Sequence, residues 1–387
     1  MLKNENIICV STMNWDFLWT RKQRFMDMLA KKGNRILYVE PTFSVAAKVR
    51  QGGTSLKVGF WPRLSQVRGN LYVLTPSLMF PFARFKCIRD INQRIFIWQV
   101  RWAQKKLNLR RPILWTYVPV YHKLAGKFFE KLFIYDCVDE HSAYPAAKKE
   151  LLKVLEEKII KTADVVFVTS WRLYEKKKLL NKNTFYVPNG VDFEFFRDVL
   201  TNKRVPKDMM AIKGPVIGWI GGVRSWLDFD LIEYIAETNP QWSIVFVGPV
   251  TEKVNLEPLQ KLKNVFFLGE KAKEEIPVYL QNFDVCLIPN KINELTNAMN
   301  PIKIYEYLAV GKPVVAVNLE EVRQLADVVK IANDKEEFVA LIKDSLYRDD
   351  REQILKRIQK AKNYSWEKLL DGLIKHVEEN EKFKRGE

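Results

Sequence analysis

The sequence predicts an α/β protein with two Rossmann-like domains that face each other across a cleft, followed by a helical C-terminal tail. Short apolar runs alternate with helical stretches, which is the pattern of βαβ units around parallel sheets. The alternation stops at a turn at residues 188–192 and a linker-like stretch, and then starts again. The chain has 387 residues, which is enough for two domains of ordinary size.

Residues 1–195 are expected to form the first domain. Gly33 and Pro41 are typical of the ends of its first helix and second strand. Buried strands are predicted at 7–11, 36–40, 71–75, 113–117, 133–136 and 165–169, and helices at 21–32, 84–108, 148–162 and 171–180.

A linker is predicted at 196–213, and the second domain at 214–362. Residues 363–387 are expected to form a last helix, with Ser365 as its N-cap, that packs back toward the first domain. Open α/β sheets bind ligands beyond the C-terminal ends of their strands, so the substrates are expected there. Strands of the second domain are predicted at 216–220, 243–247, 265–268, 285–289 and 314–317.

The positive charge of the chain lies in its N-terminal half. The formal net charge is +17, and residues 1–190 hold 34 basic and 14 acidic side chains, against 29 and 32 in the remainder. Within residues 48–131 the counts are 17 and 2. We therefore expect the first domain to meet an anionic partner.

Composition argues against several classes of protein. No run of apolar residues is long enough to span a membrane, and the first residues lack the features of a signal peptide, so a cytoplasmic location is expected. The four cysteines stand far apart and the chain has three histidines. Neither a disulfide framework nor a metal site is predicted, and no cofactor is expected.

The most specific motif lies at 297–315. Asn300 and Pro301 are favoured as N-cap and first-turn residues, so a helix is expected to start there. Its free N–H groups and positive dipole end suit a diphosphate, near Lys303 and Ile304. Glu306, one turn later, can accept hydrogen bonds from a ribose. The alternative is an ordinary capped helix with a solvated lysine and glutamate.

A glycine-rich turn is expected to complete the nucleotide site. Gly221 and Gly222 follow the first strand of the second domain, with Arg224 close behind, and Gly248 follows the next strand. Glycines let the backbone approach a pyrophosphate, and the arginine can neutralise its charge. An ordinary strand-to-helix turn is the alternative.

These motifs resemble the nucleotide-sugar signature of GT-B glycosyltransferases, specifically glycosyltransferase family 4. Residues 187–192, 217–224 and 245–249 are similar to further elements of that family, so the resemblance covers most of 185–320. It implies a metal-independent hexosyltransferase that uses a nucleotide-diphosphate sugar, more often a UDP-sugar, with Glu306 on the ribose. The resemblance is nearest to bacterial teichuronic-acid, capsule and O-antigen type transferases.

The chain departs from the family at one position. The family has two glutamates separated by seven residues, and Ala298 stands where the first is expected. Asn297, Asn300 or Glu294 is expected to contact the donor sugar instead. The stereochemical outcome stays open.

The first domain is expected to supply the acceptor site and a catalytic base. The loop after the first strand offers Asn14, Trp15, Arg21 and Gln23 as acceptor contacts, although buried packing of the tryptophan is an alternative. In the loop at 135–141, Asp139 is the first candidate for the base and His141 the second. The alternative is an acidic helix N terminus capped by Asp139 and Ser142.

Residues 80–111 combine basic and aromatic side chains, and helical spacing places six apolar ones on one face. Such a face is typical of an interfacial helix on an anionic membrane, although a core-facing helix with a basic outer face is the alternative. The apolar residues are Phe85, Ile88, Ile91, Ile95, Trp98 and Trp102, and the flanking cations are Arg84, Arg94, Arg101, Lys105 and Lys106.

We therefore predict a glycosyltransferase on the inner face of the cell membrane, acting on a lipid-linked or cell-surface polysaccharide acceptor. A nucleotide-sugar epimerase of the same fold is the first alternative. A basic nucleic-acid-binding protein is the second, and it is disfavoured because no nucleic-acid-binding motif is found.

Overall fold

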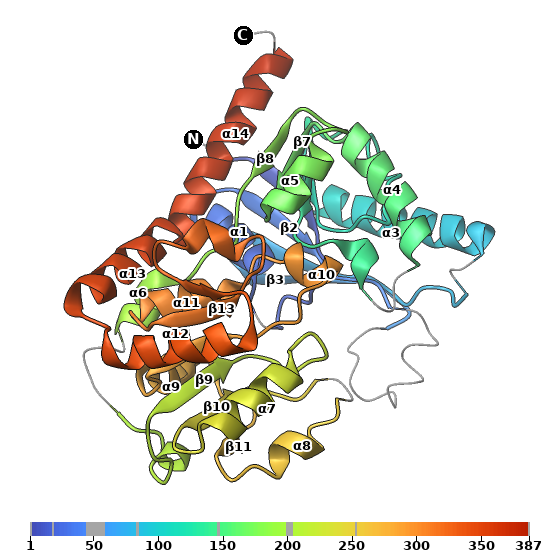
Figure 1. Cartoon of the computed structure of the whole chain (residues 1–387). Coiled ribbons are helices and arrows are strands. Elements are labelled where there is room, and N and C mark those ends of the chain that lie inside the picture. Colours follow the sequence, from blue (N-terminus) through green and yellow to red (C-terminus); the bar gives the residue numbers. More distant parts are fainter. Residues whose placement is uncertain are drawn as a thin grey trace. The chain divides into compact units, whose positions relative to one another are not determined.

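The computed structural model describes residues 2–17, 19–43, 59–82, 85–144, 148–198, 204–251 and 254–385. The chain forms two compact units, each with its own sheet (Figure 1). Unit 1 comprises Met1–Thr169, Leu173–Val187 and Leu370–Glu387, and unit 2 comprises Ser170–Arg172 and Pro188–Leu369.

Unit 1 contains an eight-stranded sheet in the order β3-β4-β2-β1-β5-β6-β7-β8. All neighbouring pairs are parallel except β3 and β4. The sequence did not predict β3, because this exposed edge strand has no apolar run. The strands are β1 (Asn6–Val10), β2 (Arg35–Val39), β3 (Arg63–Arg68), β4 (Leu71–Thr75), β5 (Ile113–Thr116), β6 (Leu132–Cys137), β7 (Val165–Val168) and β8 (Thr184–Tyr186).

Helices pack apolar faces on this sheet. In α3, for example, Phe96, Val100 and Ala103 are buried in the same core as Ile8 and Leu114. The last helix, α14, starts in unit 2 and belongs to unit 1 from Leu370 onward. The helices are α1 (Arg21–Lys31), α3 (Lys86–Lys106), α4 (Lys149–Thr162), α5 (Trp171–Lys177) and α14 (Trp366–Arg385), with a 3₁₀ turn at His141–Ala143.

Unit 2 contains a six-stranded, wholly parallel sheet in the order β11-β10-β9-β12-β13-β14. All but β14 were predicted within a residue or two. The strands are β9 (Val216–Ile220), β10 (Ser243–Val247), β11 (Val265–Phe267), β12 (Val285–Ile288), β13 (Val314–Val317) and β14 (Lys330–Ala332).

Short helices in the predicted linker and loops escaped prediction, because they have too few residues for a periodic pattern. The helices of unit 2 are α6 (Phe193–Asp198), α7 (Phe229–Thr238), α8 (Glu257–Gln260), α9 (Ile276–Gln281), α10 (Glu294–Asn297), α11 (Ile302–Ala309), α12 (Lys335–Tyr347) and α13 (Arg351–Asn363). Among the described helices, none combines the length and the apolar character that crossing a bilayer requires.

Strand order gives each unit one switch point. From β9 the chain proceeds to one side of the sheet through β10 and β11, and from β12 it proceeds to the other side. In unit 1 the same reversal lies between β1 and β5. Loops that leave neighbouring strands in opposite directions open a crevice at the C-terminal strand ends, which is where such sheets bind ligands.

Candidate active site

Three glycine turns end the adjacent strands β9, β10 and β11. Gly221, Gly248 and Gly269 all have positive φ, at 135°, 144° and 71°. The Gly221 N–H donates to Val247 O at 2.8 Å, and the Gly248 N–H donates to Gly269 O at 2.8 Å. A Cβ at Gly248 would overlap the carbonyl oxygen of Gly221. Only glycine fits this close backbone approach, so the turn is specified by sequence.

Lys303 packs its side chain against the Gly221 turn, where a Cβ would overlap it. Its Nζ lies 5.0 Å from the centroid of the Trp219 ring. The ammonium group makes no hydrogen bond or ion pair with any described residue. Burial lowers the pKa of Lys303, and the like charge of Arg224 lowers it further. The opposite charge of Glu306 raises this pKa and so opposes the shift. An anion at this position would therefore be stabilised strongly.

The start of α11 lies beside this lysine. The helix begins at Ile302, with Pro301 at the N-cap position, and no side chain caps it. The Ile304 N–H is used within the first turn, where it donates to Pro301 O at 3.2 Å. The N–H groups of Ile302 and Lys303 therefore belong to an uncapped helix start, which favours an anion.

The prediction that Asn300 caps this helix is wrong, because its amide is used elsewhere. Its Oδ1 accepts the Asn189 N–H at 3.0 Å, and its Nδ2 donates to Tyr305 Oη at 3.0 Å and to Glu321 Oε1 at 3.1 Å. These contacts bury Asn300 and fix the residues before α11.

The other predicted donor-sugar residue also has an internal contact. Asn297 Oδ1 accepts the Glu320 N–H at 3.3 Å, and Ala298 beside it is fully buried. Glu294 is partly buried at the first position of α10. Their roles toward the donor sugar stay predictions.

Arg224 and Glu306 border the same region of unit 2. The Arg224 guanidinium lies 4.9 Å from the centroid of the Trp226 ring, and its Nε is 3.3 Å from where a Cβ of Gly222 would lie. Glu306 is half-buried one turn after Lys303 on α11. The structure thus places the predicted glycines, both cations and Glu306 around the switch point of the sheet.

In unit 1, the polar loop after β1 is held by its own side chains. Arg21 is buried, its Nε donates to both carboxylate oxygens of Asp136 at 3.0 and 3.1 Å, and its Nη1 donates to Val187 O at 2.9 Å. Gln23 accepts the Thr20 N–H and donates to Asn14 O. These contacts give Arg21 and Gln23 a structural part in the loop, and their acceptor roles stay predictions.

Trp15 is also packed within this loop. It is buried, and its ring centroid lies 5.1 Å from those of Trp19 and Tyr38, in edge-to-face contacts. The backbone N–H of Trp15 donates to Glu40 Oε1 at 2.9 Å. Of the four predicted acceptor residues, Asn14 has a buried Oδ1 with no hydrogen-bond partner among the described residues.

The loop after β6 brings Asp139 and His141 together with Lys22. Tyr144 Oη donates to Asp139 Oδ2 at 3.1 Å. Burial raises the pKa of Asp139, opposed by His141 and Lys22, and burial lowers the pKa of His141. A carboxylate with a raised pKa is a stronger base, so this loop can accept a proton.

Two further side chains near the switch point of unit 1 were not predicted as site residues from the sequence. Lys22 is buried, its pKa is lowered by burial, and its Nζ lies 5.5 Å from the Tyr117 ring centroid. Tyr117 Oη and His141 Nε2 are buried without hydrogen-bond partners among the described residues. Unsatisfied buried polar atoms are costly, so their grouping at the switch point indicates a binding site.

Comparison with known proteins gives the family. The family model described as "Glycosyl transferases group 1" matches residues 214–348, which contain the glycine turns and α11. TuaH of Bacillus subtilis, assigned to teichuronic acid biosynthesis as a glycosyltransferase, is 32% identical over 334 residues, covering 81% of this chain and 80% of TuaH. The chain belongs to the group 1 glycosyltransferases.

Solved structures similar to this glycosyltransferase cover nearly its whole length. Sucrose-phosphate synthase from Thermosynechococcus elongatus gives a TM-score of 0.70 at 14% identity, covering 97% of this chain and 98% of that one. A UDP-forming α,α-trehalose-phosphate synthase from Burkholderia xenovorans gives 0.69 at 13% identity, covering 97% and 99%. The likeness confirms the predicted GT-B fold.

A buried tyrosine that the sequence motifs did not indicate links α11 to β9 in this glycosyltransferase. Tyr307 is fully buried, and its Oη accepts the Ile220 N–H at 3.0 Å. This bond ties α11 to the end of β9 and so sets Lys303 against the Gly221 turn. A tyrosine among the apolar residues of a helix was the available signal, because a buried Tyr hydroxyl usually has a polar partner.

Proposed function

We propose that this glycosyltransferase transfers a hexosyl group from a UDP-sugar to a lipid-linked or cell-surface polysaccharide acceptor. The observation that carries the proposal is Lys303, a partly buried cation packed on Gly221 at the uncapped start of α11. The two negatively charged phosphates of a nucleoside diphosphate would complement this arrangement.

The same groups would stabilise the leaving group. When the bond between the sugar and the diphosphate breaks, negative charge develops on the departing phosphate oxygen. Lys303, Arg224 and the first N–H groups of α11 supply fixed positive charge there, and we propose that they act in place of a divalent metal. Glu306, one turn later, would accept hydrogen bonds from the ribose hydroxyls.

Unit 1 would accept the proton of the attacking hydroxyl. Asp139 is the stronger candidate, because burial raises its pKa and makes its ionised form more basic. His141 is the second candidate, because burial favours its neutral form, which can also accept a proton. Asn14, Lys22 and Tyr117 would then contact the acceptor.

The identity of the substrates has separate support. The structural relative from Burkholderia xenovorans is UDP-forming, which favours uridine as the donor base. The assignment of TuaH to teichuronic acid biosynthesis favours a cell-envelope polysaccharide as the product. Asn297 and Asn300, one residue before and two residues after Ala298, remain our candidates for the donor sugar.

The acceptor would be met at the inner face of the cell membrane. On α3, the predicted apolar stripe is not buried as a whole, since Phe85, Ile91 and Trp98 are 50%, 46% and 54% exposed. Phe96, Val100 and Ala103, on another face, are buried in the core, and Ile95 and Trp102 of the stripe are only partly buried against it. An exposed aromatic stripe with basic flanks is typical of a helix that lies on an anionic bilayer.

The test is transfer of a radiolabelled sugar from a panel of UDP-sugars, with and without added bacterial membranes. We expect UDP release, label in the lipid or polysaccharide fraction, and no change when EDTA is added. A converted sugar nucleotide with no transferred label would indicate the epimerase. Absence of both reactions in well-folded protein, with every donor of the panel, would overturn the proposal.

A further inference from the structure

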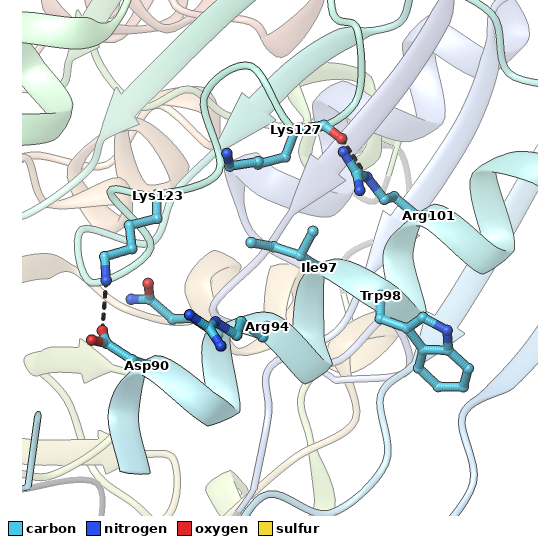
Figure 2. Close-up of a pocket in the computed structure, with 8 residues that line it drawn as sticks. Asp90, Arg94, Ile97, Trp98, Arg101, Lys123 and Lys127 are labelled. Carbon is cyan, nitrogen blue, oxygen red and sulfur yellow. Dashed lines mark hydrogen bonds and ion pairs between the residues drawn. The ribbon is translucent and has the colours of Figure 1, made fainter. Parts of the chain in front are cut away.

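A cavity of about 450 Å³ lies in unit 1, between α3 and the segment at 120–131. Figure 2 shows Arg94, Ile97 and Arg101 on α3 opposite Lys123 and Lys127. Four cations and one carboxylate, Asp90, line this space together with Gln93 and Trp98. The cavity is therefore strongly positive and has an apolar component.

Two of the cations are held by neighbours, and two are not. Lys123 Nζ donates to Asp90 Oδ1 at 2.6 Å, and Arg101 Nε donates to Lys127 O at 2.7 Å, both shown as dashed lines in Figure 2. The Arg94 guanidinium and the Lys127 ammonium make no hydrogen bond or ion pair with a described residue. Their charges are thus available to an anion in the cavity.

A buried acceptor stands beside these two cations. Gln93 is 5% exposed, and its Nε2 donates to Val120 O at 2.9 Å. Its Oε1 is buried and has no hydrogen-bond partner among the described residues. A buried unsatisfied oxygen favours a ligand that brings a donor, such as a hydroxyl.

Two exposed aromatic side chains belong to the elements that form the cavity. Trp98 lines the cavity and is 54% exposed, and Phe129, two residues after Lys127, is 80% exposed. Exposed aromatic side chains next to lysine and arginine side chains are typical of a protein surface at the boundary between lipid head groups and acyl chains. A soluble anion would gain nothing from them.

We infer that this cavity binds the head group of an anionic phospholipid, with Arg94 and Lys127 on the phosphate and Gln93 accepting a head-group hydroxyl. The inference deepens the proposed function, because it rests on the membrane-bound state proposed above and assigns a lipid site to it. Phosphatidylglycerol, a phosphodiester with free hydroxyls, has the required chemistry.

The test is co-sedimentation of the full chain with phosphatidylcholine vesicles that contain or lack phosphatidylglycerol. The pocket variant is Arg94→Ala/Lys127→Ala, and the control is Lys105→Ala/Lys106→Ala, which removes the same charge from α3 outside the cavity. Because hydrogen bonds to a charged group are the stronger kind, we expect the pocket variant to lose at least about tenfold more affinity than the control. Arg94→Lys should also weaken binding, since a lysine lacks the planar fork that holds a phosphate.

Three outcomes would overturn the inference. Equal losses in the two double variants would show a diffuse electrostatic attraction, and equal binding to both kinds of vesicle would exclude an anionic head group. The third outcome concerns glycerol 3-phosphate, added at the millimolar concentration that saturates the free protein. If it displaces the protein completely from vesicles, the cavity would be assigned to a soluble phosphate. The UDP-induced thermal shift is measured on the same variants. If UDP does not raise the melting temperature of the wild type, that result counts against the proposed function and does not change the vesicle result.

Discussion

Arg21 in unit 1 and Lys303 in unit 2 are cations in the first turn of a helix, and each lies near the switch point of its own parallel sheet. Arg21 is buried and paired with Asp136 through two hydrogen bonds. Lys303 packs on a glycine turn and a tryptophan ring, and no anionic side chain among the described residues is in hydrogen-bond contact with it. We infer that the same residue class at the same kind of position serves stability in unit 1 and binds a ligand in unit 2.

The largest expected effect is on stability, at Arg21. Arg21→Ala leaves the carboxylate of Asp136 buried without its partner, and loss of one member of a buried pair costs about 3–5 kcal/mol. Urea denaturation of the wild type and the variant measures this loss. Lys303→Ala is the matched control and should change the free energy of unfolding by less than about 1 kcal/mol. If both variants lose a similar free energy of unfolding, Arg21 and Lys303 would not differ in their contribution to stability.

Asp139→Asn comes next and tests the base. The amide cannot accept the proton, and general-base catalysis contributes roughly a hundredfold or more to such reactions. We expect the rate of sugar transfer to fall by that factor while affinity for UDP is unchanged. In the wild type, the rate should fall as pH decreases through a pKa above the usual carboxyl value of about 3.9, because burial raises it. If Asp139→Asn keeps both the wild-type rate and its fall at low pH, the base would be His141 instead.

Lys303→Ala should weaken UDP binding by about ten- to a hundredfold, since a hydrogen bond to a charged group contributes about 1.5–3 kcal/mol. Isothermal titration calorimetry measures the affinity. Lys312→Ala, at a half-buried lysine after the same helix, is the control and should bind UDP as the wild type does. Unchanged affinity in Lys303→Ala would mean that the diphosphate lies elsewhere.

The smallest expected effect is the pH dependence of that binding. Burial lowers the pKa of Lys303 below the ordinary value of about 10.4, so its charge is lost as pH rises through the lowered pKa. Affinity for UDP should therefore fall, by less than about tenfold, between neutral and moderately alkaline pH. Lys303→Arg keeps its charge over this range and should flatten the profile. A steeper fall in that variant than in the wild type would contradict the assignment.

The contrast also explains what the sequence could predict. The strand pattern and the glycine turns depend on residues close together in the chain, and both were read correctly. The Lys303 region has a local motif as well, so a helix start beside the glycine turn was predicted without coordinates, and its role in nucleotide binding stays a prediction. The roles of Arg21 and Asn300 depend on Asp136 and Asn189, which are 115 and 111 residues away. No local pattern indicates such pairs, so the ion pair of Arg21 was not predicted and Asn300 was assigned to a helix cap.

Lys22 and Tyr117 were missed for a related reason. Each is an ordinary residue in its own segment, and they become notable only when β1 and β5 pair and bring their C-terminal ends together. The edge strand β3 was missed because its side chains are largely exposed, which leaves no apolar alternation to detect. Tertiary pairing, rather than local preference, decides these features.

The central claim is that the start of α11 holds a nucleoside diphosphate, with Glu306 on its ribose. The most direct measurement is the thermal stability of the wild type and Glu306→Ala with UDP, GDP, ADP and CDP. A ligand that binds only the folded state raises the melting temperature by mass action. We predict a shift with UDP that is lost or strongly reduced in Glu306→Ala. No shift with any of the four nucleotides in well-folded wild type, or an equal shift in the variant, would contradict the account.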